Sequence, residues 1–136
     1  MRKKIIIYAI ILFVLSFVFA LFFYDNFNPV KVTAVELAKD YTIDKSAADK
    51  KYLDKTIILT GNVKAYYRLL GARHVLELET GDSKNFVFCF FIDQRNEYEA
   101  GLFNEGEKVE LKVKCVGINS YSYVKGIKVE VKKIIN

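Results

Sequence analysis

Residues 55–65 read Lys-Thr-Ile-Ile-Leu-Thr-Gly-Asn-Val-Lys-Ala. Two sets of residues alternate in this stretch, one apolar or glycine and one polar: Ile57, Leu59, Gly61, Val63 and Ala65 against Thr60, Asn62 and Lys64. This period of two predicts a strand with one buried face. The glycine inside the strand predicts a bulge or a sharp bend. Because a small closed barrel needs one long, bent strand that pairs with both halves of the sheet, we expect this stretch to be its first strand.

Four more strands and a helix are expected after the first strand. The apolar patterns predict strands over residues 74–80, 86–92, 109–115 and 123–135, a helix over 94–103, and a polar loop over 117–122. The run 86–92 is apolar on both faces, so we expect it to be covered on both sides, with the N-terminal helices as the outer cover. The order strand, strand, strand, helix, strand, strand is that of the five-stranded OB-fold barrel, and the fold class is therefore mainly β.

Two short helices are expected before the barrel. Thr33 with Glu36 three residues later forms a capping-box pattern, and apolar residues at helical spacing follow it. Asp44 or Ser46 is expected to cap the second helix. Helices this short are not stable alone, so we expect them to pack on the barrel and close one end.

The N-terminal residues predict a membrane anchor. An apolar run over residues 5–24 follows Arg2, Lys3 and Lys4. A helix of about twenty residues just spans a hydrocarbon core about 30 Å thick, so we expect a single transmembrane signal anchor. The basic flank predicts that the helix spans the bacterial cytoplasmic membrane with the N-terminus on the cytoplasmic side, and that the rest of the chain lies outside the cytoplasm. The alternative is a cleaved signal peptide ending at Val18-Phe19-Ala20, which would make the protein secreted.

We therefore expect three parts in the chain. Residues 1–24 form the anchor, and residues 25–32, which contain the single proline of the chain, form a linker. Residues 33–136 form an extracytoplasmic OB-fold domain with two short leading helices.

The net charge of +5 is concentrated near the anchor. Three of the 21 basic residues precede the apolar run and the first acidic residue is Asp25, which leaves 18 basic against 16 acidic residues for the remainder. A nucleic-acid footprint requires basic groups gathered on one face, and so small an excess gives it little support.

The two cysteines, Cys89 and Cys115, both lie in predicted strands and lack the paired spacing of a metal or redox motif. Two buried free thiols are the favoured interpretation. A disulfide stays open as the alternative because the domain is expected outside the cytoplasm.

Several segments resemble the tRNA_anti-like family of small OB-fold proteins. The resemblance rests on Ala47-Ala48-Asp49-Lys50-Lys51-Tyr52-Leu53-Asp54-Lys55 leading into 56–63, on Val87-Phe88-Cys89-Phe90-Phe91, and on Gly106-Glu107-Lys108-Val109 with Lys114-Cys115-Val116-Gly117. It covers roughly residues 33–134 and implies an OB fold in an exported or membrane-attached bacterial protein of unknown function. The haem chaperone of cytochrome c maturation combines an anchor with an OB barrel in the same way. It attaches haem through a histidine near the end of its barrel, whereas the single histidine here is His74, at the second strand.

Aromatic and basic residues gather beside two predicted loops. In OB barrels the loops between strands one and two and between strands four and five flank the ligand-binding face. The candidate ligand-binding residues are Tyr66, Tyr67, Arg68, Arg73, His74, Tyr121, Tyr123 and Lys125.

These observations predict a binding module for a protein, peptide, glycan or small molecule at the cell envelope, attached to the membrane through residues 5–24. One alternative is a single-stranded oligonucleotide-binding domain, since aromatic rings stack on bases and basic groups contact phosphates. The other is a structural subunit of an envelope assembly. The expected location of the domain outside the cytoplasm disfavours nucleic acid as its ligand. The sequence has no phosphate loop, nucleophile elbow or set of zinc ligands, so we expect no enzyme activity, metal or cofactor.

Overall fold

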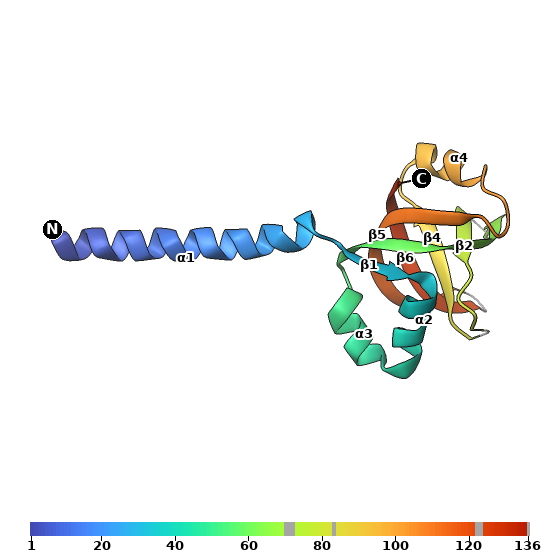
Figure 1. Cartoon of the computed structure of the whole chain (residues 1–136), viewed down its shortest axis with the longest axis horizontal. Helices are drawn as coiled ribbons and strands as arrows, with labels where there is room; N and C mark the ends of the chain where they lie inside the picture. Colours follow the sequence, from blue (N-terminus) through green and yellow to red (C-terminus); the bar gives the residue numbers. More distant parts are fainter. Residues whose placement is uncertain (70–72, 83, 122–123, 136) are drawn as a thin grey trace.

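A computed structural model describes residues 1–69, 73–82, 84–121 and 124–135 of the protein. A long N-terminal helix, α1 (Arg2–Phe27), leads to a β-barrel with three short helices (Figure 1). The segment Arg2–Tyr24 of α1 has a mean hydropathy of 3.1 and none of it is buried against the rest of the chain. The helix is therefore long and apolar enough to cross a membrane.

Six strands form the barrel and its single extension. They are β1 (Val30–Thr33), β2 (Thr56–Arg68), β3 (His74–Leu78), β4 (Phe86–Phe91), β5 (Lys108–Tyr121) and β6 (Val124–Ile134). The sheet order is β1-β2-β3-β4-β6-β5, and a pairing between β2 and β5 closes the barrel. The strands β2 to β6 are the five of the predicted OB fold, and that prediction is confirmed.

The strand β1 was not predicted. Val30–Thr33 runs parallel to β2, with Val30 opposite Ile57 and Thr33 opposite Thr60. Only Asn28 and Pro29 separate it from the end of α1. The expected linker over residues 25–32 thus contributes most of a strand, and the anchor helix is joined almost directly to the sheet.

The first barrel strand is longer than predicted and contains a bulge. Val63 pairs with Leu78 but Ala65 pairs with the preceding Glu77, so Lys64 is the extra residue. The bulge reverses the alternation: Tyr66 packs against the main core, while Tyr67 packs against the outer face. The prediction that Ala65 shares the buried face of the strand is wrong for this reason.

Gly61 serves close packing rather than the bulge. A Cβ added there would lie 3.0 Å from the Cβ of Ala34, the first residue of α2. The missing side chain thus allows the first turn of α2 to approach the strand.

The two early helices close one end of the barrel. In α2 (Ala34–Ile43) the Thr33 hydroxyl accepts a bond of 3.1 Å from the Glu36 amide, which confirms the capping box. Asp44 rather than Ser46 caps α3 (Lys45–Tyr52), by accepting a 3.0 Å bond from the Ala47 amide. Their buried residues join the core cluster of the barrel interior: Ala34, Leu37, Ala38, Tyr41, Ala48 and Tyr52.

The outer face of β4 is covered by side chains and not by these helices. Val87, Cys89 and Phe91 point into the main core. Phe88 and Phe90 belong to a separate cluster with Val75, packed against Tyr67, Leu69 and Phe86. The prediction that the N-terminal helices cover the outer face is therefore wrong.

The predicted polar loop over residues 117–122 is largely strand. β5 continues to Tyr121 and pairs with β6 as an antiparallel hairpin, with Ile118 opposite Ile127 and Asn119 opposite Gly126. The glycine and polar residues of this segment predicted a loop, although the segment is part of a long hairpin.

Cys89 and Cys115 are buried free thiols, as predicted. Both lie opposite Val129, Cys89 on β4 and Cys115 on β5. Two strand spacings put their Cα atoms about 10 Å apart, beyond the reach of a disulfide of about 4.4–6.8 Å. A disulfide between them would require the sheet to rearrange.

Candidate functional site

The structure divides the predicted ligand-binding residues into two groups. The bulge at Lys64 turns Tyr66 towards α4 (Gln94–Ala100) and Tyr67 towards the outer face of the sheet. Arg68 and Arg73 are exposed at the ends of β2 and β3, and Lys125 is exposed at the start of β6. The side chain of Tyr121 and the whole of Tyr123 lie outside the described residues.

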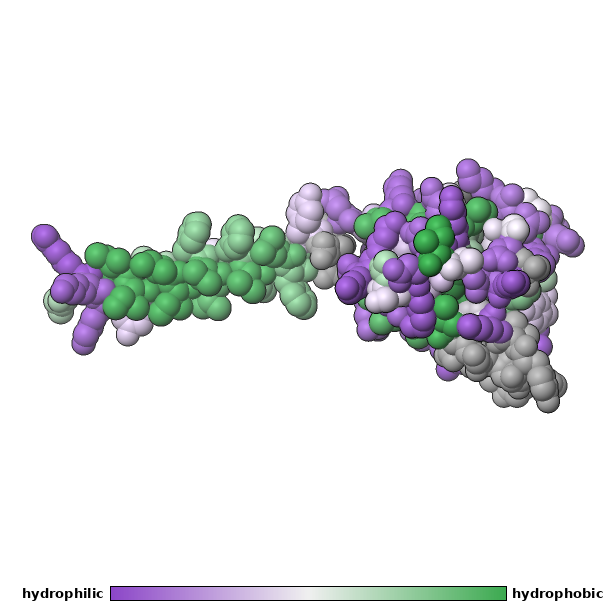
Figure 2. Space-filling model, turned by 90° about the horizontal axis from the view of Figure 1, so that it is seen from below, coloured by the Kyte–Doolittle hydropathy of each residue, from purple (hydrophilic) through white to green (hydrophobic). Residues whose placement is uncertain are grey.

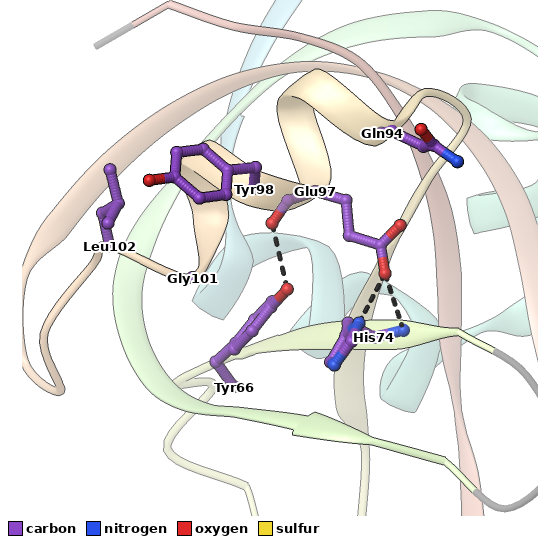
Figure 3. Close-up of a pocket in the computed structure, with 7 residues that line it drawn as sticks. All are labelled: Tyr66, His74, Gln94, Glu97, Tyr98, Gly101 and Leu102. Atoms are coloured by element: carbon purple, nitrogen blue, oxygen red, sulfur yellow. Dashed lines mark hydrogen bonds and ion pairs between the residues drawn. The ribbon is translucent and has the colours of Figure 1, made fainter.

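The first group lines a cavity beneath α4, called here the α4 pocket. It has a volume of about 330 Å³. Tyr66 and His74 project from the barrel strands towards the helix, with their rings stacked 5.3 Å apart at 8° (Figure 3). The lining residues are Tyr66, His74, Gln94, Glu97, Tyr98, Gly101 and Leu102.

Glu97 holds the α4 pocket together. Its Oε1 lies 2.5 Å from His74 Nδ1, and its backbone carbonyl accepts a 2.9 Å bond from the Tyr66 hydroxyl (Figure 3). The hydrogen bond to His74 lowers the pKa of the Glu97 carboxyl, while burial raises the pKa of the Tyr66 hydroxyl. Because Tyr66 and His74 both hydrogen-bond to Glu97 and their rings stack on each other, we infer that these three residues fix α4 to the barrel.

The second group belongs to an outward surface that we call the aromatic face: Tyr67, Val75, Phe86, Phe88 and Phe90. Strand periodicity puts three phenylalanines on the outer side of β4, where a solvated antiparallel sheet would carry polar residues. The rings of Phe86 and Phe88 stack at 5.9 Å and 25°. In OB barrels the ligand face is flanked by the loops that join strands one to two and four to five, which correspond in sequence order to β2–β3 and β5–β6 here.

Gly126 of β6 makes room for the aromatic face. It lies opposite Phe86, and a Cβ added to it would lie only 2.4 Å from Cε2 of Phe88. The ring of Phe88 therefore lies directly across the backbone of the neighbouring strand.

Two lysines lie over the phenylalanine rings. The Nζ of Lys64 is 4.5 Å from the ring centre of Phe86, and the Nζ of Lys128 is 5.0 Å from that of Phe90. Each lysine is also close to a carboxylate: Lys64 lies 2.8 Å from Glu77, and Lys128 lies 3.7 Å from Glu130. The cations over the aromatic face are therefore balanced by two acids of the same face.

Glu77 is the buried polar centre of this surface, with 7% of its area exposed. Its Oε1 pairs with Lys64, and its Oε2 accepts a 3.1 Å bond from the Tyr67 hydroxyl. Burial, with the nearby Glu77 carboxylate, raises the pKa of Tyr67 to about 12. Glu77 thus lies on the outer side of β3, and its side chain is covered there by Lys64 and Tyr67.

Sequence analysis missed most of the aromatic face. It placed Tyr67 near a ligand, but assigned Phe86, Phe88 and Phe90 to packing beneath a helix. The sequence signal for this surface is the run 86–92, which is apolar on both faces although the short predicted helices are not long enough to cover its outer face. In the described part of the chain, no three His, Cys, Asp or Glu side chains are grouped closely enough to hold a metal ion.

Comparisons with known proteins agree with the fold. The family model described as tRNA_anti-like matches residues 1–127. A putative aspartyl-tRNA synthetase from Leishmania major Friedlin superposes with a TM-score of 0.54 and 16% identity, over 79% of this chain. The matched part is only 20% of that synthetase.

A putative nucleic acid-binding lipoprotein from Klebsiella pneumoniae subsp. pneumoniae MGH 78578 also superposes with a TM-score of 0.54, at 10% identity. The match covers 77% of this chain and 92% of the lipoprotein. At such identities both likenesses concern the fold alone. A comparison with curated proteins finds no match.

Proposed function

The chain belongs to the tRNA_anti-like family, and from that premise we propose that it is a membrane-anchored OB-fold module that binds an extracytoplasmic ligand through the aromatic face. The observation that carries the proposal is the row of phenylalanines on the outer side of β4. Outward aromatic residues on a sheet face are costly in water unless a partner or other side chains cover them. Here Tyr67 and Leu69 pack against the phenylalanines, and the long, flexible side chains of Lys64 and Lys128 lie over Phe86 and Phe90, where they can move aside for a ligand.

The charge balance of the aromatic face favours a ligand without a high charge. Lys64 and Lys128 are each close to a glutamate, so an incoming phosphate would compete with acids already present. A peptide segment or a glycan offers apolar or ring surfaces for stacking and few charges to desolvate. We infer that the module acts by binding and not by catalysis.

The proposed address rests on α1. Arg2, Lys3 and Lys4 precede its apolar segment, and this asymmetry favours a cytoplasmic N-terminus in a bacterium. Alkaline phosphatase fused to the C-terminus tests the orientation, because that reporter is active only where its disulfides form. High activity in intact cells is expected, whereas low activity with intact fusion protein would refute the extracytoplasmic address.

A single-stranded oligonucleotide is the second candidate ligand. Two observations favour it: two lysines lie over the phenylalanine rings of the aromatic face, and the similar Klebsiella lipoprotein is described as a putative nucleic acid-binding protein. Oligothymidylate binding at increasing salt separates the candidates. Phosphate contacts weaken steeply as salt rises, whereas stacking on a neutral ligand does not.

The aromatic face itself is tested with the full-length protein in neutral detergent micelles, probed with peptide and glycan arrays. The site variant is Phe86→Ala, because Phe86 is the partly exposed member of the three. The matched control is Tyr98→Ala, an aromatic residue 73% exposed in the α4 pocket. We expect Phe86→Ala to weaken binding about tenfold, as a stacking contact is worth about 1–3 kcal/mol. Equal binding by both variants would assign the site elsewhere.

A further inference from the structure

The end of the barrel that joins α1 contains a cavity unrelated to the aromatic face. We call it the junction cavity; its volume is about 460 Å³. Phe22 of the anchor helix contributes to one wall, and strands and loops of the barrel form the others. Its charged lining residues are Lys51, Lys55, Lys114, Lys132 and Asp54.

The position of Phe22 gives the depth of the junction cavity relative to a membrane. The apolar segment of α1 ends at Tyr24, so Phe22 lies in its last turn. Tyrosines favour the membrane–water interface, and this places the cavity where hydrocarbon gives way to headgroups. Figure 2 shows the same transition, with the apolar surface of α1 ending where the polar surface of the barrel begins.

The lysines of the junction cavity outnumber its acids by four to one. Lys55 donates to the backbone carbonyl of Lys50 at 3.1 Å, and Lys132 donates to the Thr56 hydroxyl at 3.0 Å. Both oxygens are neutral, so these two charges stay available to an anion.

The other two lysines have acidic neighbours. Lys114 lies 3.6 Å from the Asp54 carboxylate, which is itself 75% exposed. Lys51 pairs at 2.9 Å with Asp40, which is not part of the cavity lining. A positive excess remains at the cavity.

We propose that the junction cavity binds the headgroup of an anionic phospholipid. The inference rests on the membrane anchor of the proposed function, but it holds on either side of the membrane. The phosphodiester oxygens would accept hydrogen bonds from Lys55, Lys114 and Lys132, while the acyl chains follow the apolar surface of α1 beside Phe22. Basic groups next to a membrane-spanning helix attract anionic lipids in this way. The lipid would hold the barrel against the membrane by a second attachment besides the chain.

Native mass spectrometry of the full-length protein in neutral detergent micelles tests the proposal. Phosphatidylglycerol and phosphatidylcholine are titrated separately, and bound lipid is counted. We expect one phosphatidylglycerol to bind with at least a tenfold preference, since each lysine near an anionic headgroup is worth about fivefold in affinity. The triple variant Lys55→Gln, Lys114→Gln, Lys132→Gln should lose that preference.

Two further variants control for net charge and for folding. The control for net charge is the triple variant Lys39→Gln, Lys84→Gln, Lys108→Gln, which removes the same charge elsewhere. Lys108 pairs with Asn62 of β2 and Lys114 pairs with Thr56, so these two lysines are about 20 Å apart along the ladder. This variant should keep the preference. The triple variant Lys55→Arg, Lys114→Arg, Lys132→Arg keeps the charges and should keep the preference as well.

Three results would overturn the proposal. Equal binding of both lipids by the wild-type protein would remove the site. Competition by equimolar inorganic phosphate would make it a general phosphate site and not a lipid site. Purification of the full-length protein as a soluble species without any detergent would refute the anchor itself. That outcome is distinct from a protein that needs detergent but shows no lipid preference.

Discussion

Gly126→Ala is the most direct perturbation of the aromatic face, because it adds one methyl group and removes nothing. The new Cβ would lie 2.4 and 2.7 Å from two atoms of the Phe88 ring and 2.8 Å from the backbone carbonyl of Phe86. The ring can turn away, but the carbonyl belongs to the β4 strand paired with β6 and cannot move without disturbing the ladder. The substitution should therefore be costly although alanine is small.

The expected loss follows from these contacts. Adding a methyl group to a filled space costs about 1–3 kcal/mol. Phe88 is 5% exposed, so a ring displaced into water would lose burial worth up to about 3 kcal/mol. We expect a net loss of about 2–3 kcal/mol, which lowers the Tm of a domain of about 100 residues by about 8–12 °C. Gly101→Ala is the matched control, since its added Cβ meets nothing closer than 3.3 Å, and its cost should stay below about 1 kcal/mol.

The assay is thermal unfolding of the full-length protein in neutral micelles, followed by the near-ultraviolet circular dichroism of its nine tyrosines. A double-mutant cycle with Phe88→Leu isolates the contact between ring and methyl. In the Phe88→Leu background, the loss of unfolding free energy caused by Gly126→Ala should be smaller by at least about 1 kcal/mol. The loss that remains measures the contact between the added methyl group and the Phe86 carbonyl. A Tm for Gly126→Ala within about 2 °C of the wild type, or additive costs in the cycle, would show that Phe88 does not lie across Gly126.

Three further predictions concern other parts of the barrel. Burial raises the pKa of the Cys89 and Cys115 thiols, so iodoacetamide should label them only after unfolding. The two thiols lie two strands apart, so an oxidant should form no disulfide between them and should leave the intact mass of the native protein unchanged. A loss of 2 Da, the mass of two hydrogens, would contradict this. Tyr67 keeps its proton to about pH 12 in the folded protein and ordinarily loses it near pH 10, so its contribution to stability is complete below pH 10 and declines as pH rises from 10 to 12. Tyr67→Phe should cost about 1 kcal/mol in urea unfolding at pH 7 but flatten the loss above pH 10, whereas an unchanged alkaline slope would assign that loss to other groups. Thr33→Ala removes the cap of α2 and should lower the free energy of unfolding by about 1 kcal/mol, which Thr33→Ser should largely restore; equal stability of the alanine and serine variants would contradict the capping role.

The barrel could be predicted because its signals are local and repeated. Alternating residues in β2, β5 and β6 and the capping residues of α2 and α3 each decide their own element. The strand β1 could not be found in this way, since Val30–Thr33 is only four residues long and is stabilised by pairing with β2. Short strands depend on their partners for stability, and composition carries little trace of the pairing.

The candidate site was half predictable for a related reason. A single bulge at Lys64 decides that Tyr66 and Tyr67 lie on opposite sides of the sheet, and nothing in the composition of residues 63–67 marks the extra residue. The doubly apolar run 86–92 correctly indicated a covered strand. What covers it depends on where α2 and α3 pack, and Leu37 and Tyr52 point into the barrel end and not over the phenylalanines.

The strand β2 links the two sites proposed for the protein and sets their separation. Thr56, at its start, lines the junction cavity, and Tyr67, near its end, belongs to the aromatic face. Figure 1 shows β2 running from the side of the barrel next to α1 towards the opposite side. Eleven residues of strand correspond to about 35 Å of chain, and somewhat less in a straight line because the strand is bent. A lipid held in the junction cavity would therefore fix one end of β2 at the membrane and present the aromatic face away from it, where a partner in the surrounding space can reach it.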